Sequence, residues 1–146
     1  QGSLYAVPYD FRSGIGSHIS VAVNFNEPDG LALWKAAVDE LNSVRHLFRG
    51  DYYPLTGYTQ DTHVWIAWQY NCPDIGEGLV QAFRRVNNTQ NKRTFRLKDL
   101  DPSALYSVTN LDIGTVVNVT GESLMTAGLE ICLSSQGSAM VTYVKN

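Results

Sequence analysis

The chain has 146 residues, of which 44% are hydrophobic and 17% are charged, and its net charge is -3 at pH 7. A chain of this length folds as about one domain and buries roughly 68–70% of its surface without a metal or a disulfide staple. The weakly acidic balance excludes the basic footprint of a nucleic-acid-binding or anionic-membrane-binding protein. No apolar run approaches the roughly 20 residues of a membrane span, so we expect neither nucleic acid nor membrane as a partner.

The first quarter of the chain predicts one strand followed by one helix. Residues 1–3 resemble a scar left by a protease, and glycine and proline interrupt any period between residues 4 and 17. Residues 18–25 alternate apolar and polar positions, which predicts a strand. Residues 29–48 predict an amphipathic helix with Asp29 as the N-cap and Gly50 as the C′ residue. Its apolar positions are Trp34, Ala37, Val38, Leu41, Val44, Leu47 and Phe48.

A lone strand and helix are half of a βαβ unit. A parallel strand needs a neighbour and a crossover connection, and neither follows here. Residues 4–50 are therefore interpreted as the last strand–helix unit of a larger α/β domain. If the rest of that domain is missing, this helix and the strand at 18–25 expose apolar surface. That surface is expected either to fold back on the following domain or to form a two-fold homodimer.

Residues 51–61 are predicted to be a linker between this unit and a different architecture. The linker and the residues after it hold an aromatic cluster: Tyr52, Tyr53, Tyr58, Trp65 and Trp68. These rings favour packing between domains, and a sugar-stacking platform is the alternative. Trp65 and Trp68 should point to opposite faces of their strand, so at most one lies in a core between sheets.

From residue 62 to residue 146 the pattern changes to short strands. About seven are predicted, which is typical of an antiparallel sandwich or barrel. They are expected at 63–71, 79–86, 94–97, 105–109, 115–119, 129–133 and 139–144, with a helical turn near 123–127.

Few residues here suggest chemistry. The two cysteines favour two free, mostly buried thiols, with a single Cys72–Cys132 bridge as the alternative. The histidines, which lie far apart, are His18, His46 and His63. The acids, which fall on predicted turns and strand edges and are expected to be solvated, are Asp99, Asp101, Glu122 and Glu130. We therefore predict no catalytic residue, no metal site and no cofactor in this chain.

Three stretches together resemble the C-terminal region of family 36-type glycoside hydrolases, the α-galactosidase (melibiase) group. The first stretch is PYDFRS at 8–13, leading into the predicted strand and helix. The second is GDYYPLT at 50–56, followed by WIAWQ at 65–69 and GEGLVQAFRR at 76–85. The third is LKDLDP at 97–102, followed by YSV at 106–108 and GESLM at 121–125.

The resemblance implies a catalytic (β/α)₈ barrel followed by an antiparallel Greek-key β-sandwich. On that mapping, residues 18–25 and 29–48 are the last barrel strand and helix, and residues 62–146 are the sandwich. Retaining glycosidases need two carboxylates about 5–5.5 Å apart, and the family carries both on earlier barrel strands. The resemblance thus implies a non-catalytic segment, inactive alone, that packs on and stabilises the barrel of its parent chain. A stand-alone carbohydrate-binding module or a self-associating structural module is the alternative.

Overall fold

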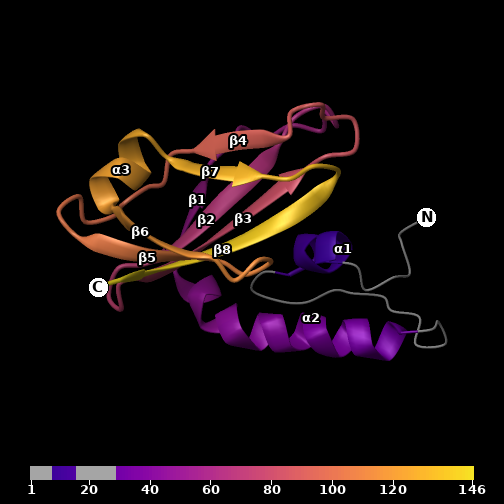
Figure 1. The fold of residues 1–146 in the computed structure, drawn as a ribbon, viewed down its shortest axis with the longest axis horizontal. Coiled ribbons are helices and arrows are strands. Elements are labelled where there is room, and N and C mark those ends of the chain that lie inside the picture. Colours follow the sequence, from indigo (N-terminus) through magenta and orange to yellow (C-terminus); the bar gives the residue numbers. More distant parts are fainter. Residues whose placement is uncertain (1–7, 16–28) are drawn as a thin grey trace. The chain divides into compact units, whose positions relative to one another are not determined.

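The computed structural model describes residues 8–15 and 29–146, shown as a ribbon in Figure 1. Residues 1–3, interpreted as a scar, and the strand predicted at 18–25, including His18, lie outside the described residues. The chain divides into two compact units, Gln1–Arg49 and Gly50–Asn146. Within the described ranges, no helix combines the length and the apolar character needed to cross a membrane.

Two α-helices form the described part of the N-terminal unit. Helix α1 spans Pro8–Ser13, and α2 spans Gly30–Val44 and continues as a 3-10 helix, η1, over Arg45–Arg49. The prediction of α2 is confirmed apart from its tightened last turn. Helix α1 was not predicted, because six residues are too few to show a period. Pro8 suits its first turn, since a proline there removes only an N–H that has no partner in the helix.

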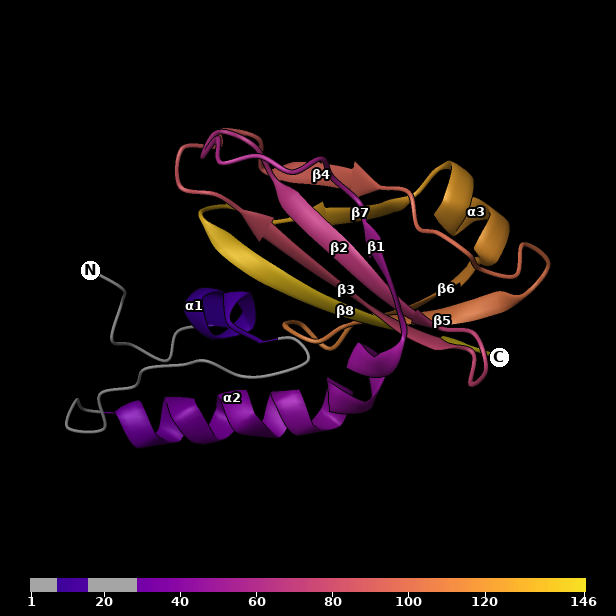
Figure 2. The ribbon, with the colours of Figure 1, turned by 180° about the vertical axis from the view of Figure 1, so that it is seen from behind.

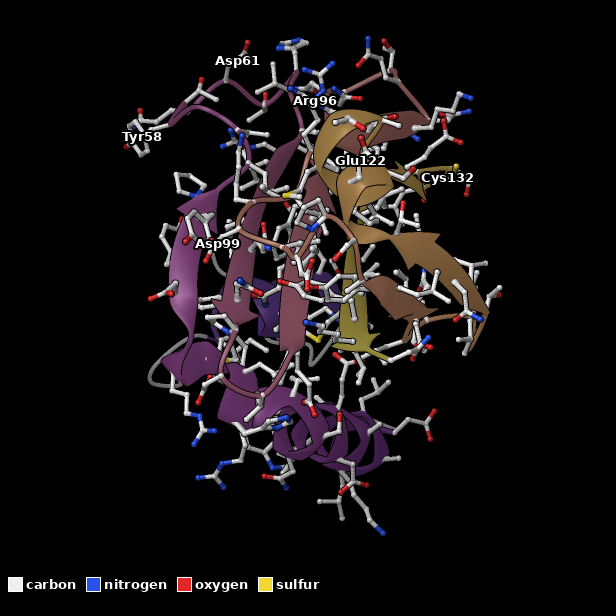
Figure 3. All side chains as sticks on the ribbon, turned by 90° about the vertical axis from the view of Figure 1, so that its left-hand side faces the viewer. Tyr58, Asp61, Arg96, Asp99, Glu122 and Cys132 are labelled. Carbon is white, nitrogen blue, oxygen red and sulfur yellow. The ribbon has the colours of Figure 1, made fainter. Side chains whose placement is uncertain are left out.

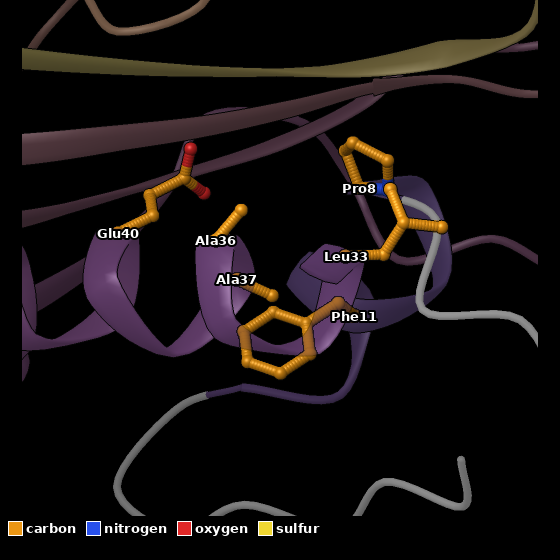
Figure 4. A pocket seen from close by; sticks show the side chains of 6 residues that line it. All are labelled: Pro8, Phe11, Leu33, Ala36, Ala37 and Glu40. Carbon is orange, nitrogen blue, oxygen red and sulfur yellow. The ribbon is translucent and has the colours of Figure 1, made fainter. Parts of the chain in front are cut away.

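A ring contact and an ion pair link helix α1 to α2. The Phe11 ring meets the Trp34 ring edge-on, with centroids 5.7 Å apart. The Arg12 guanidinium donates two hydrogen bonds to the Glu40 carboxylate, at 2.8 and 2.6 Å. A small pocket of about 110 Å³ remains between the two helices, and Figure 4 shows the side chains that line it. Its lining residues are Pro8, Phe11, Leu33, Ala36, Ala37 and Glu40.

The two ends of the predicted helix differ from expectation. Asp29 occupies the N-cap position, but it has a left-handed backbone with φ 65°, and its side chain makes no capping hydrogen bond. Only its carbonyl oxygen takes part, accepting the N–H of Leu33 at 2.9 Å. Gly50 is not among the glycines with positive φ. A side chain there would lie 2.5 Å from the backbone oxygen of Asn71, so Gly50 allows close backbone approach rather than a left-handed turn.

Eight described strands build the second unit as two antiparallel sheets, which Figure 2 shows from behind. The larger sheet has the order β1-β2-β3-β8-β5-β6, and the smaller sheet pairs β4 with β7. The strands are β1 (Asp51–Pro54), β2 (Ile66–Cys72), β3 (Glu77–Arg84), β4 (Lys92–Phe95), β5 (Leu105–Asn110), β6 (Val116–Thr120), β7 (Leu129–Cys132) and β8 (Gly137–Lys145). Helix α3 (Gly121–Thr126) connects β6 to β7.

The antiparallel sandwich is confirmed. All seven strands predicted after residue 62 are present, with ends shifted by a few residues, and α3 stands where a helical turn was expected. The side chain of Thr120 caps α3 by accepting the N–H of Ser123 at 3.2 Å. Strand β1 was not predicted. It lies in the stretch expected to be a linker, and it pairs with β2 so that Tyr52 faces Tyr70.

The core lies between the two sheets. Small residues meet in register across three strands of the larger sheet, where Ala67 pairs with Ala82 and Ala82 pairs with Ala139. They leave room for the larger side chains packed against them. The buried members of the core are Trp65, Ala67, Val80, Ala82, Phe95, Leu97, Leu100, Tyr106, Val108, Leu124, Ile131, Ala139, Val141 and Tyr143.

One glycine in this core is required by its neighbour. Gly78 pairs with Tyr143 across β3 and β8. A Cβ at Gly78 would lie 2.0 Å from the ring of Tyr143. The tyrosine ring therefore occupies the space that any other residue at position 78 would need.

Candidate functional site

The predicted aromatic cluster does not form one site. Tyr52 and Trp68 lie on the face of the larger sheet that is opposite the core. Tyr52 is 54% exposed, and its ring meets Tyr70 edge-on at 5.5 Å. Trp68 is half-buried: its indole N–H donates to Gln81 Oε1 at 2.7 Å, and its ring lies 5.1 Å from Phe83. On this face, Tyr52 is more exposed than Trp68 and Tyr70.

The core side of the sheet holds two other members of the cluster. Trp65 is fully buried in the sandwich core, and its indole N–H donates to the backbone oxygen of Gln90 at 3.1 Å. Trp65 and Trp68 thus point to opposite faces, as predicted. The Tyr53 hydroxyl donates to Asp99 Oδ2 at 3.3 Å. Desolvation, followed by the negative charge of Asp99, raises the pKa of Tyr53 above its ordinary value.

The fifth member, Tyr58, is 93% exposed on the loop between β1 and β2. This loop has a defined internal structure. The Arg85 guanidinium donates to the backbone oxygens of Thr59 and Asp61 at 3.0 and 2.7 Å. The backbone N–H of His63 donates to Asp61 at 2.9 Å, which lowers the pKa of that carboxyl group. Figure 3 shows Tyr58 and Asp61 projecting at one end of the sandwich.

A buried polar network, which the sequence analysis missed, joins the larger sheet to the segment before β5. Gln69 exchanges two hydrogen bonds with the backbone of Lys98, at 2.9 and 2.8 Å. The Tyr143 hydroxyl receives the second Gln69 N–H at 2.7 Å and donates to Asn71 Oδ1 at 2.8 Å. Asn71 in turn donates to the backbone oxygen of Asp99 at 2.7 Å. Burial raises the pKa of Tyr143 far above its ordinary value, so its hydroxyl stays protonated.

This network is structural in character, since every polar atom in it is satisfied. No buried side-chain nitrogen or oxygen in the described part of the chain lacks a hydrogen-bond partner. Alternation along β2 predicted that the strand has two faces. It did not indicate that the face with Gln69 and Asn71 is buried. The available signal was Gly78, whose missing side chain admits the tyrosine ring beside them.

The acidic side chains considered in the sequence analysis form ion pairs or are exposed to solvent. Among residues 8–15 and 29–146, no group of three or more histidine, cysteine and acidic side chains can hold a metal ion. Asp101 pairs with Lys145 at 2.8 Å, and Glu130 lies 3.2 Å from Lys92. Asp99 and Glu122 are exposed, as predicted.

Neither cysteine forms a disulfide, as favoured by the sequence analysis. Cys72 is buried, but Cys132 is exposed, which differs from the expectation that both thiols are buried. Cys132 lies at the end of β7, and Figure 3 shows it at the surface of the sandwich. The prediction of its burial was wrong because an edge strand of a two-stranded sheet leaves alternate side chains in solvent.

The fold and these contacts define an antiparallel β-sandwich module. The family described as the glycosyl hydrolase family 36 (GH36) C-terminal domain matches residues 65–144, and the chain belongs to that family. The resemblance stated from the sequence is thereby confirmed.

Solved structures give the same fold. The GH36 α-galactosidase AgaB from Geobacillus stearothermophilus is 25% identical with a TM-score of 0.68, over 86% of this chain and 17% of that structure. The α-galactosidase from Lactobacillus brevis is 15% identical with a TM-score of 0.68, over 86% of this chain and 18% of that structure. The galactosidase domain of the α-galactosidase–sucrose kinase AgaSK is 18% identical with a TM-score of 0.68, over 87% and 18%.

The chain therefore spans less than a fifth of the length of these structures. A search of the curated proteins found no match.

Proposed function

We propose that this chain acts as the non-catalytic C-terminal sandwich of an α-galactosidase-like glycoside hydrolase, and that it packs on and stabilises a catalytic barrel. The observation that carries the proposal is the family match over residues 65–144, because that family is a named domain of GH36 enzymes. The structural similarity of 86% of this chain to part of a GH36 α-galactosidase supports it.

The chemistry of the described residues supports the non-catalytic part of the proposal. Glycoside hydrolysis by a retaining enzyme needs a nucleophile and an acid/base, both carboxylates, facing one sugar. Here Asp101, Glu130 and Glu40 each form an ion pair with a lysine or arginine side chain of the same unit. None of these three is seen facing a second carboxylate among the described residues. This chain would accordingly supply stability to an enzyme and not its reacting groups.

The contact with the barrel is proposed to use the outer face of the larger sheet, around Tyr52 and Trp68. Tyr52 offers a large ring with little conformational entropy to lose, and Tyr70 and Phe83 support the two rings from within the same sheet. Tyr53, Tyr58 and Trp65 lie elsewhere and are not assigned to this contact.

The test is to compare the full gene product with a version that lacks residues 50–146. Loss of the sandwich should lower the temperature at which α-galactosidase activity is lost, or prevent soluble expression. The isolated chain should not hydrolyse a chromogenic α-galactoside. Hydrolysis by the isolated chain, or a gene that encodes no barrel, would contradict the proposal. Tyr52→Ala in the full product should lower the Tm, and Tyr58→Ala is the matched control.

A carbohydrate-binding role is the second candidate, because Tyr52 and Tyr58 expose aromatic rings on structured elements. Titration of the chain with galactosides at millimolar concentration, followed by tyrosine and tryptophan fluorescence, tests it. Tyr52→Ala and Tyr58→Ala should each weaken binding if their rings stack on sugar. Trp65→Ala is unsuitable, because Trp65 is a core residue whose loss would unfold the sandwich. Absence of saturable binding would eliminate this candidate.

A further inference from the structure

The two sheets of the sandwich have four outer strand edges. In the larger sheet these belong to β1 and β6, and in the smaller sheet to β4 and β7. An outer edge presents unpaired N–H and C=O groups that can pair with another chain, and proteins commonly block such edges with charged residues or proline. Three of the four edges are blocked in this way, by Asp51 and Pro54 on β1, Lys92 and Arg93 on β4, and Glu130 on β7.

Strand β6 is the exception. Residues 113–121 contain no charged residue and no proline. Ile113, Val116 and Val117 are 71%, 57% and 50% exposed, so this edge presents an apolar surface to solvent. Figure 1 shows β6 as the last strand of the sheet, beside β5. Strands with high β-propensity and no charge are the ones most able to add a further strand.

An apolar groove runs along the same edge. It has a volume of about 240 Å³ and lies between β6 and β7, and all four residues of β7 line it. Its apolar lining consists of Val108, Ile113, Val117, Leu129, Ile131 and Val141. The exposed apolar surface of β6 is therefore continuous with this groove.

The register with β5 shows which backbone groups face outward. The N–H of Asn110 donates to the oxygen of Thr115 at 3.1 Å, and Val108 lies opposite Val117 two residues along the ladder. Because hydrogen-bonded pairs alternate in an antiparallel ladder, Val117 bonds toward β5, and Val116 and Asn118 direct their N–H and C=O groups to the open side.

We propose that the β6 edge is the binding surface for a second copy of this chain, paired antiparallel about a two-fold axis at Val117. In this register, Val116 of one copy exchanges hydrogen bonds with Asn118 of the other. Val117 faces Val117 of the second copy in the non-hydrogen-bonded position, where side chains come closest. The valine at the axis then lies beside both grooves, and apolar surface on each copy leaves water.

A second copy fits this edge because the strand is complementary to itself. Antiparallel self-pairing needs no charge of opposite sign, and residues 113–121 carry none that would repel an identical strand. A two-fold arrangement uses the same patch on both copies, and this patch joins one strand edge to one groove. The larger sheets of the two copies would become one continuous sheet.

Sedimentation equilibrium of the isolated chain, from micromolar to millimolar concentration, is the first test. We expect a reversible monomer–dimer equilibrium that Val117→Lys weakens by about tenfold or more, because two like charges would then face each other. Val86→Lys is the matched control, since Val86 is 60% exposed but lies outside β6, and it should leave dimerisation unchanged. Circular dichroism verifies that both variants are folded.

A second variant tests the register itself. Cα atoms in a non-hydrogen-bonded pair lie about 4.5 Å apart, which suits a disulfide. In a Cys132→Ser background, which removes the exposed native thiol, Val117→Cys should form a covalent dimer on mild oxidation much faster than Val86→Cys. The proposal is overturned by a monomer at every concentration, by a dimer that Val117→Lys does not weaken, or by equal cross-linking of the two cysteine variants.

Discussion

The two units of this chain are stabilised by different means. Among the described residues of the N-terminal unit, a ring contact and an ion pair join α1 to α2, and a pocket remains between them. In the sandwich, antiparallel ladders are continuous across six strands, and a satisfied polar network fixes the segment that crosses the core. Helices of this length are marginal without tertiary packing, whereas a sheet with a filled core is stable. The sandwich is therefore expected to behave as the independent folding unit.

The largest effect is expected at Gly78. Gly78→Ala places a methyl group where the Tyr143 ring lies, 2.0 Å away, and should destabilise the sandwich by about 3 kcal/mol. Gly57→Ala is the matched control, because nothing lies within 4 Å of the added group. Urea unfolding followed by circular dichroism gives both free energies. Equal stability of the two variants would show that the β3–β8 ladder yields more easily than the packing indicates.

The next effect concerns the buried network. Tyr143→Phe leaves the Gln69 donor and the Asn71 acceptor without the hydroxyl that joins them, at a cost of about 2 kcal/mol. Tyr53→Phe removes a surface hydroxyl that binds Asp99, and should leave the free energy of unfolding nearly unchanged. Hydrogen exchange should show faster exchange of the Lys98 amide only in Tyr143→Phe. Unchanged exchange there would mean that Gln69 alone holds the segment.

A smaller and local effect is expected in the N-terminal unit. Glu40→Gln removes the charge that binds Arg12 and should weaken the docking of α1 by about 1.5 kcal/mol. The backbone amides of α1 should then exchange with solvent roughly tenfold faster. The urea midpoint of the sandwich should not move. A shift of that midpoint as large as the one caused by Tyr143→Phe would contradict the contrast between the units.

The smallest effect is the pH dependence of the Asp101–Lys145 pair. Hydrogen bonds from Lys145 and then Ser103 lower the pKa of Asp101 from 3.8 to about 2. A carboxyl group with a lowered pKa in the folded state stabilises it above the unfolded pKa. That contribution is lost as the pH falls from about 4 toward about 2. Asp101→Asn should flatten the stability curve in this window, and the exposed-turn variant Asp74→Asn should not. If the stability of Asp101→Asn falls between about pH 4 and about pH 2 as much as that of the original chain, the ion pair contributes nothing to stability in solution.

The sequence predicted the parts of the fold that carry a local pattern. Alternation located β2, short segments at regular spacing located the six strands after it, and apolar spacing located α2. Strand β1 was missed because four residues ending in Pro54 look like a connection until β2 is present to pair with them. The role of Gln69 was missed for a related reason: its partners, Lys98 and Tyr143, are distant in sequence, so no local pattern identifies the buried face.

The position of β8 has a consequence for the order in which the protein can form. Residues 137–145 are the last strand along the chain, yet they lie between β3 and β5 in the middle of the larger sheet. During synthesis, β1–β3 and β5–β6 emerge earlier and can form only two separate sheets, with β3 and β5 as their unpaired inner edges. The sheet becomes continuous only when residues 137–145 insert between them, so the sandwich cannot be completed until these residues have left the ribosome. A nascent chain halted before that point would expose two strand edges that the finished fold conceals.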